Sequence, residues 1–243
     1  MTRLQVHVDG AMTGEANMAR DAELLEQHRA GDDPVLRIYR WDPPAVTIGY
    51  NQDLASFDRA AVVAAGYGLV RRPTGGRAIL HAEELTYAVV GTSPGPLFGA
   101  SLHETYMRIN EALLEFLRGL GIDADISEGE SREEMRGLVC FKSAGRHEVS
   151  VAGRKIIGSA QRRRGDVFLQ HGSILAGPRH LDLLNFLGGG GRASLAGATT
   201  DLGRLLGRTL GPDDLDGLAP ALAAAFGRVL GLETVWRDRT GRS

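Results

Sequence analysis

The amino-acid sequence predicts an α+β fold, and three observations carry this prediction. Segments with the two-residue period of strands are interspersed with segments of helical period, without the strict βαβ order of a doubly wound sheet. The 243 residues, 43% of them hydrophobic, are enough for one large domain with a buried core. The 33 glycines indicate many tight turns between short elements.

Strands and helices are both predicted in the N-terminal half. Alternating apolar and polar residues, interrupted by prolines at 43 and 44, predict strands at 4–8, at 34–50 in two pieces, at 69–70 and within 78–91. Helices are predicted at 15–28, 55–65 and 102–120. In the last helix, Tyr106, Ile109, Leu113 and Leu117 recur at helical spacing and form an apolar stripe. We expect that stripe to pack on the sheet.

The C-terminal half is predicted to contain a β-meander followed by two helices. The acidic stretch 123–134 is typical of a solvated loop, and strands are predicted at 147–151, 155–160 and 167–175. Four consecutive glycines at 188–191 predict a flexible joint. The second helix beyond it carries an apolar stripe formed by Leu215, Leu218, Leu222, Phe226 and Val229.

Charge and composition exclude several classes of protein. The 28 basic and 30 acidic side chains give a net charge of -2, without the basic excess of a general nucleic-acid binder. No apolar run approaches the roughly 18 residues of a membrane span, and the N-terminus lacks the apolar core of a signal peptide. The single cysteine rules out an internal disulfide framework. We therefore expect a cytoplasmic protein with neither nucleic acid nor membrane as a partner.

The segment 71–77 (RRPTGGR) is the first candidate for chemistry. Its two glycines allow backbone N–H groups to approach an anion or a carbonyl closely, and its arginines supply charge-assisted donors. The alternative is a plain glycine hairpin with exposed arginines. The segment is not a nucleotide-binding P-loop, because no Gly-Lys-Ser/Thr follows at the required spacing.

Lys155 is the second candidate, in the segment 151–161 (VAGRKIIGSAQ). It is one of only two lysines, with Lys142, in a chain that otherwise uses arginine. A lysine kept in such a chain marks a place where a primary amine is needed, to bind a carbonyl, a phosphate or a developing oxyanion. The alternative is a surface lysine at the end of a hairpin.

Cys140, His81 and His171 complete the candidates. A lone cysteine is most often a buried, inert residue, but Lys142 and Arg146 are near in sequence and would lower the pKa of its thiol. As a thiolate, Cys140 would be a good acyl acceptor in a two-step transfer. Either histidine can instead be a hydrogen-bonded residue of the core. No spacing typical of metal ligands occurs, so we expect no metal.

Taken together and in this order, these segments resemble the biotin/lipoate A/B protein ligase family. The resemblance is carried by 71–81, 84–87 (ELTY), 153–161 and 169–175 (LQHGSIL), and it runs from about residue 15 to about 230. The details lean towards the octanoyltransferase branch of the family. Lipoate ligases usually carry a third glycine where Arg77 stands, and the octanoyltransferases place their nucleophile in a Cys-Phe pair, which matches Cys140-Phe141.

The resemblance implies one catalytic domain over residues 1–243, without a separate accessory domain. Its fold would be a central mixed, largely antiparallel sheet flanked by helices. Cys140 would attack the thioester of octanoyl-acyl carrier protein, and Lys155 would hold the acyl carbonyl. The implied substrate-binding residues are Arg72, Thr74, Gly75, Gly76, Arg77, His81, Gly158, Ser159, Ala160, His171 and Gly172.

The acceptor implied by the resemblance is the target lysine of a lipoyl domain, either glycine-cleavage H protein or a dehydrogenase E2 subunit. The group moved would be octanoyl or lipoyl, and no cofactor is needed because the thioester already carries the energy. One alternative is a lipoate–protein ligase, which would use ATP and Mg. The other is a non-catalytic scaffold, which is suggested by Ala82 and Lys142 standing where the family usually has acidic residues.

Overall fold

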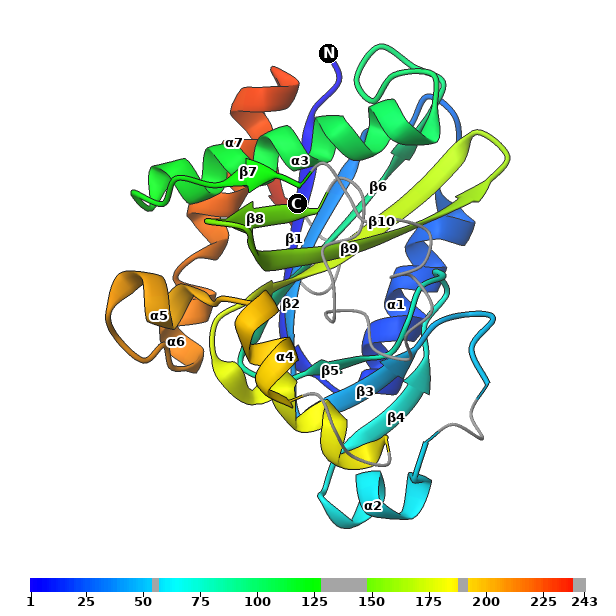
Figure 1. Cartoon of the computed structure of the whole chain (residues 1–243). Coiled ribbons are helices and arrows are strands. Elements are labelled where there is room, and N and C mark those ends of the chain that lie inside the picture. Colours follow the sequence, from blue (N-terminus) through cyan, green and yellow to red (C-terminus); the bar gives the residue numbers. More distant parts are fainter. Residues whose placement is uncertain (54–56, 128–147, 188–191, 238–243) are drawn as a thin grey trace.

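An eight-stranded mixed sheet organises the computed structural model of the chain, which describes residues 1–53, 57–127, 148–187 and 192–237 (Figure 1). Its strands are β1 (Leu4–Met12), β2 (Val35–Trp41), β6 (Glu84–Thr92), β7 (Asp125–Ile126), β8 (Val149–Val151), β9 (Arg154–Arg164), β10 (Val167–Leu175) and β11 (Thr234–Arg237). They lie in the order β11-β1-β2-β6-β10-β9-β8-β7. Only the β11-β1 and β1-β2 pairs are parallel, which confirms the predicted mixed, largely antiparallel sheet.

A smaller sheet lies beside the large one and carries the 71–77 segment. It contains β3 (Ala45–Ile48), β4 (Gly68–Arg71) and β5 (Ile79–His81) in the order β4-β3-β5. Strand β3 runs parallel to β4 and antiparallel to β5, so the 71–77 segment connects the two outer strands. The short helix α2 (Arg59–Ala64) lies below this sheet in Figure 1.

Helices cover both faces of the large sheet. Helices α3 (Leu102–Gly119) and α7 (Ala219–Leu230) pack together on one face, and α1 (Gly14–Gln27) packs on the other (Figure 1). The remaining helical segments are α4 (Arg192–Ala198), α5 (Leu202–Leu206), α6 (Pro212–Asp216) and the 3₁₀ segment Pro178–Phe186. Within the described ranges, none of these helices is long and apolar enough to cross a membrane.

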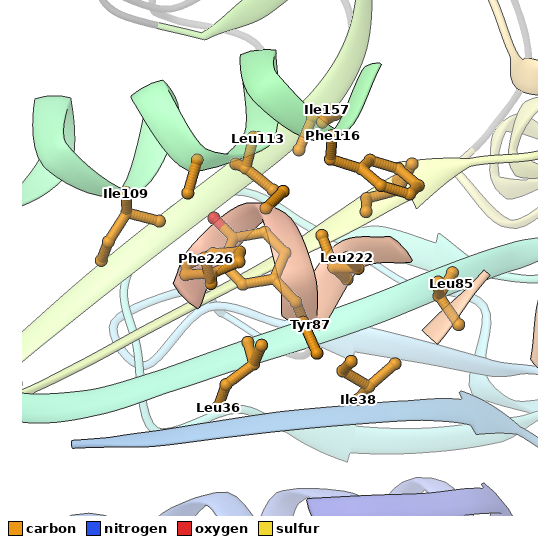
Figure 2. Close-up of a cluster of buried hydrophobic side chains, with 14 of the residues drawn as sticks. Leu36, Ile38, Leu85, Tyr87, Ile109, Leu113, Phe116, Ile157, Leu222 and Phe226 are labelled. Carbon is orange, nitrogen blue, oxygen red and sulfur yellow. The ribbon is translucent and has the colours of Figure 1, made fainter. Parts of the chain in front are cut away.

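The largest part of the core lies between α3, α7 and the sheet. Figure 2 shows side chains from α3 pointing towards α7 and towards strands β2 and β6. The labelled core residues are Leu36, Ile38, Leu85, Tyr87, Ile109, Leu113, Phe116, Ile157, Leu222 and Phe226. Ile109, Leu113 and Leu117 are fully buried, which confirms the stripe predicted for this helix. A capping box between Ser101 and Glu104 satisfies the first backbone N–H groups of α3.

Some elements differ from the sequence-based expectations. Strand β9 continues to Arg164 and not only to residue 160, because its polar end pairs in register with β10. A two-residue strand, β7, lies within the expected acidic loop. Beyond the glycine run there are four helices where two were predicted, and the edge strand β11 was not predicted at all. The glycine run itself, 188–191, lies outside the described residues.

Leu113→Ala should lower the free energy of unfolding by about 2–5 kcal/mol, because it removes buried methyl groups and leaves a cavity in the main core. Urea denaturation followed by circular dichroism measures this difference. Leu102→Ala is the matched control, since Leu102 begins the same helix but is 54% exposed, whereas Leu113 is 0% exposed. Equal losses in the two variants would contradict the packing described for α3.

Candidate functional site

A cavity lies between α1, the large sheet and the small sheet. Its empty volume is about 410 Å³, including its opening to solvent, and the surface that it exposes is mainly apolar. The residues that line it are Met18, Tyr39, Trp41, Arg72, Gly76, Ile79, His81, Thr86, Gly158, Ser159, Ala160, His171, Gly172 and Ser173. The structure thus brings together residues of all four segments that carry the family resemblance.

His81 is held at the wall of the cavity by both ring nitrogens. Its Nδ1 lies 2.7 Å from Oε1 of Glu84, and its Nε2 lies 2.8 Å from Oγ1 of Thr47 on the small sheet. The imidazole stacks on the ring of Trp41, with 4.0 Å between the ring centroids. His81 therefore ties the small sheet to the large one and presents a flat face beside the cavity.

The Glu84 carboxylate collects further donors from the cavity wall. Its Oε1 accepts hydrogen bonds from the hydroxyls of Thr86, at 2.6 Å, and Ser173, at 2.8 Å. Thr86 in turn accepts a hydrogen bond of 2.7 Å from the indole of Trp41. These contacts fix the rotamers of the polar residues that line this side of the cavity.

His171 is bound in a similar way from the opposite side. Its Nδ1 lies 2.7 Å from Oδ2 of Asp21 on α1, and its Nε2 lies 2.6 Å from Oγ1 of Thr74 in the 71–77 segment. The same Asp21 oxygen accepts the hydroxyl of Tyr39 at 2.8 Å, and Oδ1 accepts from Arg37 at 2.7 Å. His171 on β10 and Asp21 on α1 thus connect the large sheet and the helix to the 71–77 segment, which we call the glycine loop.

Burial and charge set the protonation states of this pair. Burial raises the pKa of the Asp21 carboxyl, but the hydrogen bond from His171 and the charge of Arg37 outweigh it, and the net pKa is lowered. Burial lowers the pKa of His171 by more than the neighbouring Asp21 carboxylate raises it. Asp21 is therefore an anion and His171 a neutral imidazole at neutral pH.

The glycine loop is held mainly by Arg72. Its guanidinium donates to the carbonyl oxygens of Gly75, at 2.6 and 3.0 Å, and Arg77, at 2.8 Å, and it also reaches Thr47. Gly76 adopts a left-handed φ of +90°, and a Cβ there would lie 2.7 Å from Nη2 of Arg72. The interpretation as a plain hairpin with exposed arginines is wrong for Arg72, which is buried.

Lys155 does not line the cavity. It is fully buried on β9, and its Nζ forms an ion pair of 2.5 Å with Oε1 of Glu148. The alternative of a surface lysine at a hairpin end is therefore wrong. Gly158, which does line the cavity, lies three residues further along the same strand, about 10 Å away.

Cys140 lies outside the described residues, together with Lys142 and Arg146. The described chain ends at Ser127 and resumes at Glu148, and these two residues are joined by a backbone hydrogen bond of 2.8 Å. The segment that contains Cys140 therefore begins and ends beside the residue that pairs with Lys155.

Several residues of the site were not predicted from the sequence. They are Met18, Asp21, Arg37, Tyr39, Trp41, Glu84, Thr86 and Ser173. Thr86 and Ser173 belong to segments that had been singled out, so strand alternation from His171 would have found Ser173. Arg37, Tyr39 and Trp41 alternate along β2, and an arginine on the same face as two aromatic residues was the available signal.

No group of three or more His, Cys, Asp or Glu side chains in the described part of the chain is arranged to hold a metal ion. Arg162, Arg163 and Arg164 form the polar end of β9. In the structure their guanidinium groups also bind the protein itself. Arg162 reaches the carbonyl oxygen of Pro73 and Arg164 those of Leu25 and Glu26, whereas Arg163 reaches the hydroxyls of Ser93 and Thr105.

Residues 13–226 match the model of the lipoyl protein ligase A/B catalytic domain. The chain belongs to this family. It is 45% identical over 163 residues to octanoyltransferase LipM of Moorella thermoacetica, and that match spans 65% of this chain but only 60% of the relative. The identity to octanoyltransferase LipM of Symbiobacterium thermophilum is 42% over 237 residues, which is 92% of this chain and 85% of the relative.

Solved structures of the family share the fold. A crystal structure of lipoate-protein ligase A bound with ATP is 25% identical, has a TM-score of 0.76 and covers 98% of this chain and 88% of its own. The lipoate protein ligase of Thermoplasma acidophilum is 23% identical, with a TM-score of 0.78 and the same coverage. These likenesses agree with the predicted catalytic-domain architecture.

The free energy of unfolding should fall as the pH drops from 7.5 to 5.5. Burial lowers the pKa values of His171 and His180, so the folded state binds these protons more weakly than the unfolded state, whose histidines titrate near 6.5. The contribution of these histidines to the free energy of unfolding is therefore fully present above pH 6.5 and is lost progressively below it. Chemical denaturation at several pH values measures the slope.

His171→Gln should flatten this slope, because it removes one of the buried imidazoles whose pKa is lowered. His103→Gln, at an exposed position, is the control and should keep the wild-type slope. A wild-type slope of zero or of opposite sign over this range would contradict the assignment of His171 as a buried neutral imidazole.

Proposed function

We propose that the protein is an acyltransferase that moves an octanoyl group from acyl carrier protein to the target lysine of a lipoyl domain. The observation that carries the proposal is the mainly apolar cavity, which is lined by residues of all four segments that carry the family resemblance. An octanoyl chain is neutral and apolar, so it is bound best where apolar side chains replace water. The similarity to octanoyltransferases over most of the chain supports this choice of acyl group.

The transfer would proceed in two steps through Cys140. Its thiolate attacks the thioester carbonyl of the donor, and the carrier's thiolate leaves as a new thioester forms on Cys140. The unprotonated amine of the acceptor lysine then attacks this thioester, loses a proton to solvent or a base, and expels the Cys140 thiolate. The product is an amide. Lys155 would stabilise the negative charge that develops on the carbonyl oxygen in both steps.

This reaction would need neither ATP nor a metal ion, because cleavage of the thioester bond supplies the free energy for forming the amide. The alternative, a ligase, would have to bind the phosphates of ATP and Mg together with free lipoate or octanoate. The contacts of Arg72 favour the transferase. All three of its guanidinium nitrogens donate to protein oxygens, of Gly75, Arg77 and Thr47, and would have to give up these contacts to bind the phosphates of ATP. Consumption of ATP during transfer would favour the ligase.

The partners would be two small acidic proteins. Octanoyl-acyl carrier protein is the proposed donor, and glycine-cleavage H protein or the lipoyl domain of a dehydrogenase E2 subunit is the proposed acceptor. Both the partners and the single cysteine suit a cytoplasmic location. A non-catalytic scaffold would bind the same partners without becoming acylated, so the first test below separates it from the enzyme.

Cys140→Ser should abolish octanoyl transfer and leave the fold intact, because only one sulfur atom is replaced by oxygen. The measurement is the intact mass of the protein after incubation with octanoyl-acyl carrier protein. We expect one added octanoyl group on the wild type and none on the variant. Near-full transfer by the serine variant would reject the thioester route and favour the ligase, whereas an unmodified wild type would favour the scaffold.

Lys155→Arg should slow transfer roughly 100-fold, although it keeps the positive charge. The planar guanidinium is larger than an ammonium and cannot take the fully buried place beside Glu148 in the same way. Single-turnover transfer to a lipoyl domain measures the effect. Arg154→Lys, one residue away at an exposed position, is the control and should keep the wild-type rate. Wild-type rates in Lys155→Arg would exclude Lys155 from the mechanism.

A further inference from the structure

A continuous line of buried polar contacts runs from the large sheet to the glycine loop. It begins at Arg37 on β2, passes through Asp21 on α1 and His171 on β10, and ends at Thr74 in the loop. The three contacts measure 2.7, 2.7 and 2.6 Å. Asp21, Arg37 and Thr74 are fully buried, so bulk water does not compete for the hydrogen bonds that these three residues make.

The carboxylate at the middle of the line fixes the hydrogen positions. An ionised carboxylate only accepts hydrogen bonds, so the ring nitrogen of His171 that faces Asp21 must carry the hydrogen. In a neutral imidazole the other nitrogen, Nε2, is then an acceptor, and the hydroxyl of Thr74 donates to it. The opposite tautomer would place a nitrogen lone pair against a buried anion and remove the hydrogen bond between His171 and Asp21.

The hydroxyl of Thr74 therefore couples the imidazole to the position of the loop. The carbonyl oxygen of Thr74 accepts the backbone N–H of Tyr50 at 2.9 Å, and the following carbonyls are held by Arg72. Gly76, two residues further on, forms part of the cavity wall. A change in the acceptor nitrogen of His171 would release the threonine side chain and loosen this wall.

We propose that Asp21 is a positioning residue. It holds His171 as the Nδ1–H tautomer and, through Thr74, keeps the glycine loop (71–77) in place as part of the cavity wall. The consequence for octanoyl binding rests on the proposed function, whereas the tautomer and the contact with Thr74 do not. Asp21 touches neither the cavity nor any reacting atom in this arrangement. It reaches the cavity wall through His171 and through the hydroxyl of Tyr39, and only the first of these contacts leads on to Thr74.

The competing explanation is that Asp21 serves only as a counter-ion of Arg37. The chain offers a matched control for this, because Asp9 also binds Arg37, through Nε at 2.5 Å, but does not contact His171. Asp21→Asn and Asp9→Asn each remove one buried negative charge from the same guanidinium. Only the first changes the group that faces His171.

The first measurement is the tautomer of His171, read from the ¹⁵N shifts of its ring nitrogens in the full-length protein. The signals are assigned with His171→Gln. We expect the Nδ1–H form in the wild type and in Asp9→Asn, and a loss of this preference in Asp21→Asn. The proposal is overturned if Asp21→Asn keeps the wild-type pattern or if Asp9→Asn alters it equally.

The second measurement is octanoyl transfer from acyl carrier protein, with kcat and KM determined separately. A neutral hydrogen bond contributes about 0.5–1.5 kcal/mol, so losing the Thr74 contact should raise KM roughly three- to tenfold with a smaller change in kcat. We expect this in Asp21→Asn and in Thr74→Val, rescue in Thr74→Ser, and wild-type values in Asp9→Asn. An unchanged KM in Thr74→Val would overturn the coupling to the loop.

These two measurements separate this proposal from the proposed function. Lack of octanoyl transfer by the wild type would reject the function, while the ring-nitrogen shifts would still decide the tautomer. If Asp21→Asn does not fold, Thr74→Val and Thr74→Ser remain, because they leave the pairing of Arg37 unchanged. In that case a Thr74→Ser variant with the high KM of Thr74→Val would count against the proposal.

Discussion

The buried guanidinium of Arg37 is the constraint on which the substrate side of the molecule depends. A charge that is 0% exposed is tolerated only when it is paired and hydrogen-bonded, and removing one partner of such a group costs about 3–5 kcal/mol. Arg37 meets this requirement with Asp9 on β1 and with Asn17 and Asp21 on α1. Helix α1 is therefore fixed in position and in rotation against the sheet, and Met18 on the same helix becomes a wall of the cavity.

Two carboxylate–histidine pairs then join the small sheet and the glycine loop to the large sheet and to α1. Glu84 and His81 reach Thr47 on the small sheet, while Asp21 and His171 reach Thr74 in the loop. Polar contacts at this junction are directional, so they fix the distance and the orientation between the sheets more narrowly than apolar contacts alone. The space that remains between these contacts is the cavity. Its shape is thus a consequence of the polar network around it.

Local patterns predicted the parts of the fold that depend on local sequence. The stripe of α3 was predicted because helical periodicity determines which face is buried, and the strands of the meander were predicted from short runs of strand-forming residues between turns. The four segments that carry the family resemblance were found by their residues, and the cavity brings residues of each together. Strand β11 and the pairing of Asp21 with Arg37 and His171 were not predicted, because they join residues far apart in the chain. The burial of Lys155 likewise depends on Glu148 and on the neighbouring strands, which no local pattern records.

Strand β9 connects the apolar cavity to the buried charged pair, and this connection gives the proposed transfer its geometry. Gly158 lines the cavity, whereas Lys155 pairs with Glu148 about 10 Å away along the strand. In the proposed transfer, the apolar end of the acyl chain would occupy the cavity and its carbonyl would lie towards the ammonium group. Ser127 and Glu148, between which Cys140 falls in the sequence, are joined by a backbone hydrogen bond of 2.8 Å, and Glu148 is the partner of Lys155.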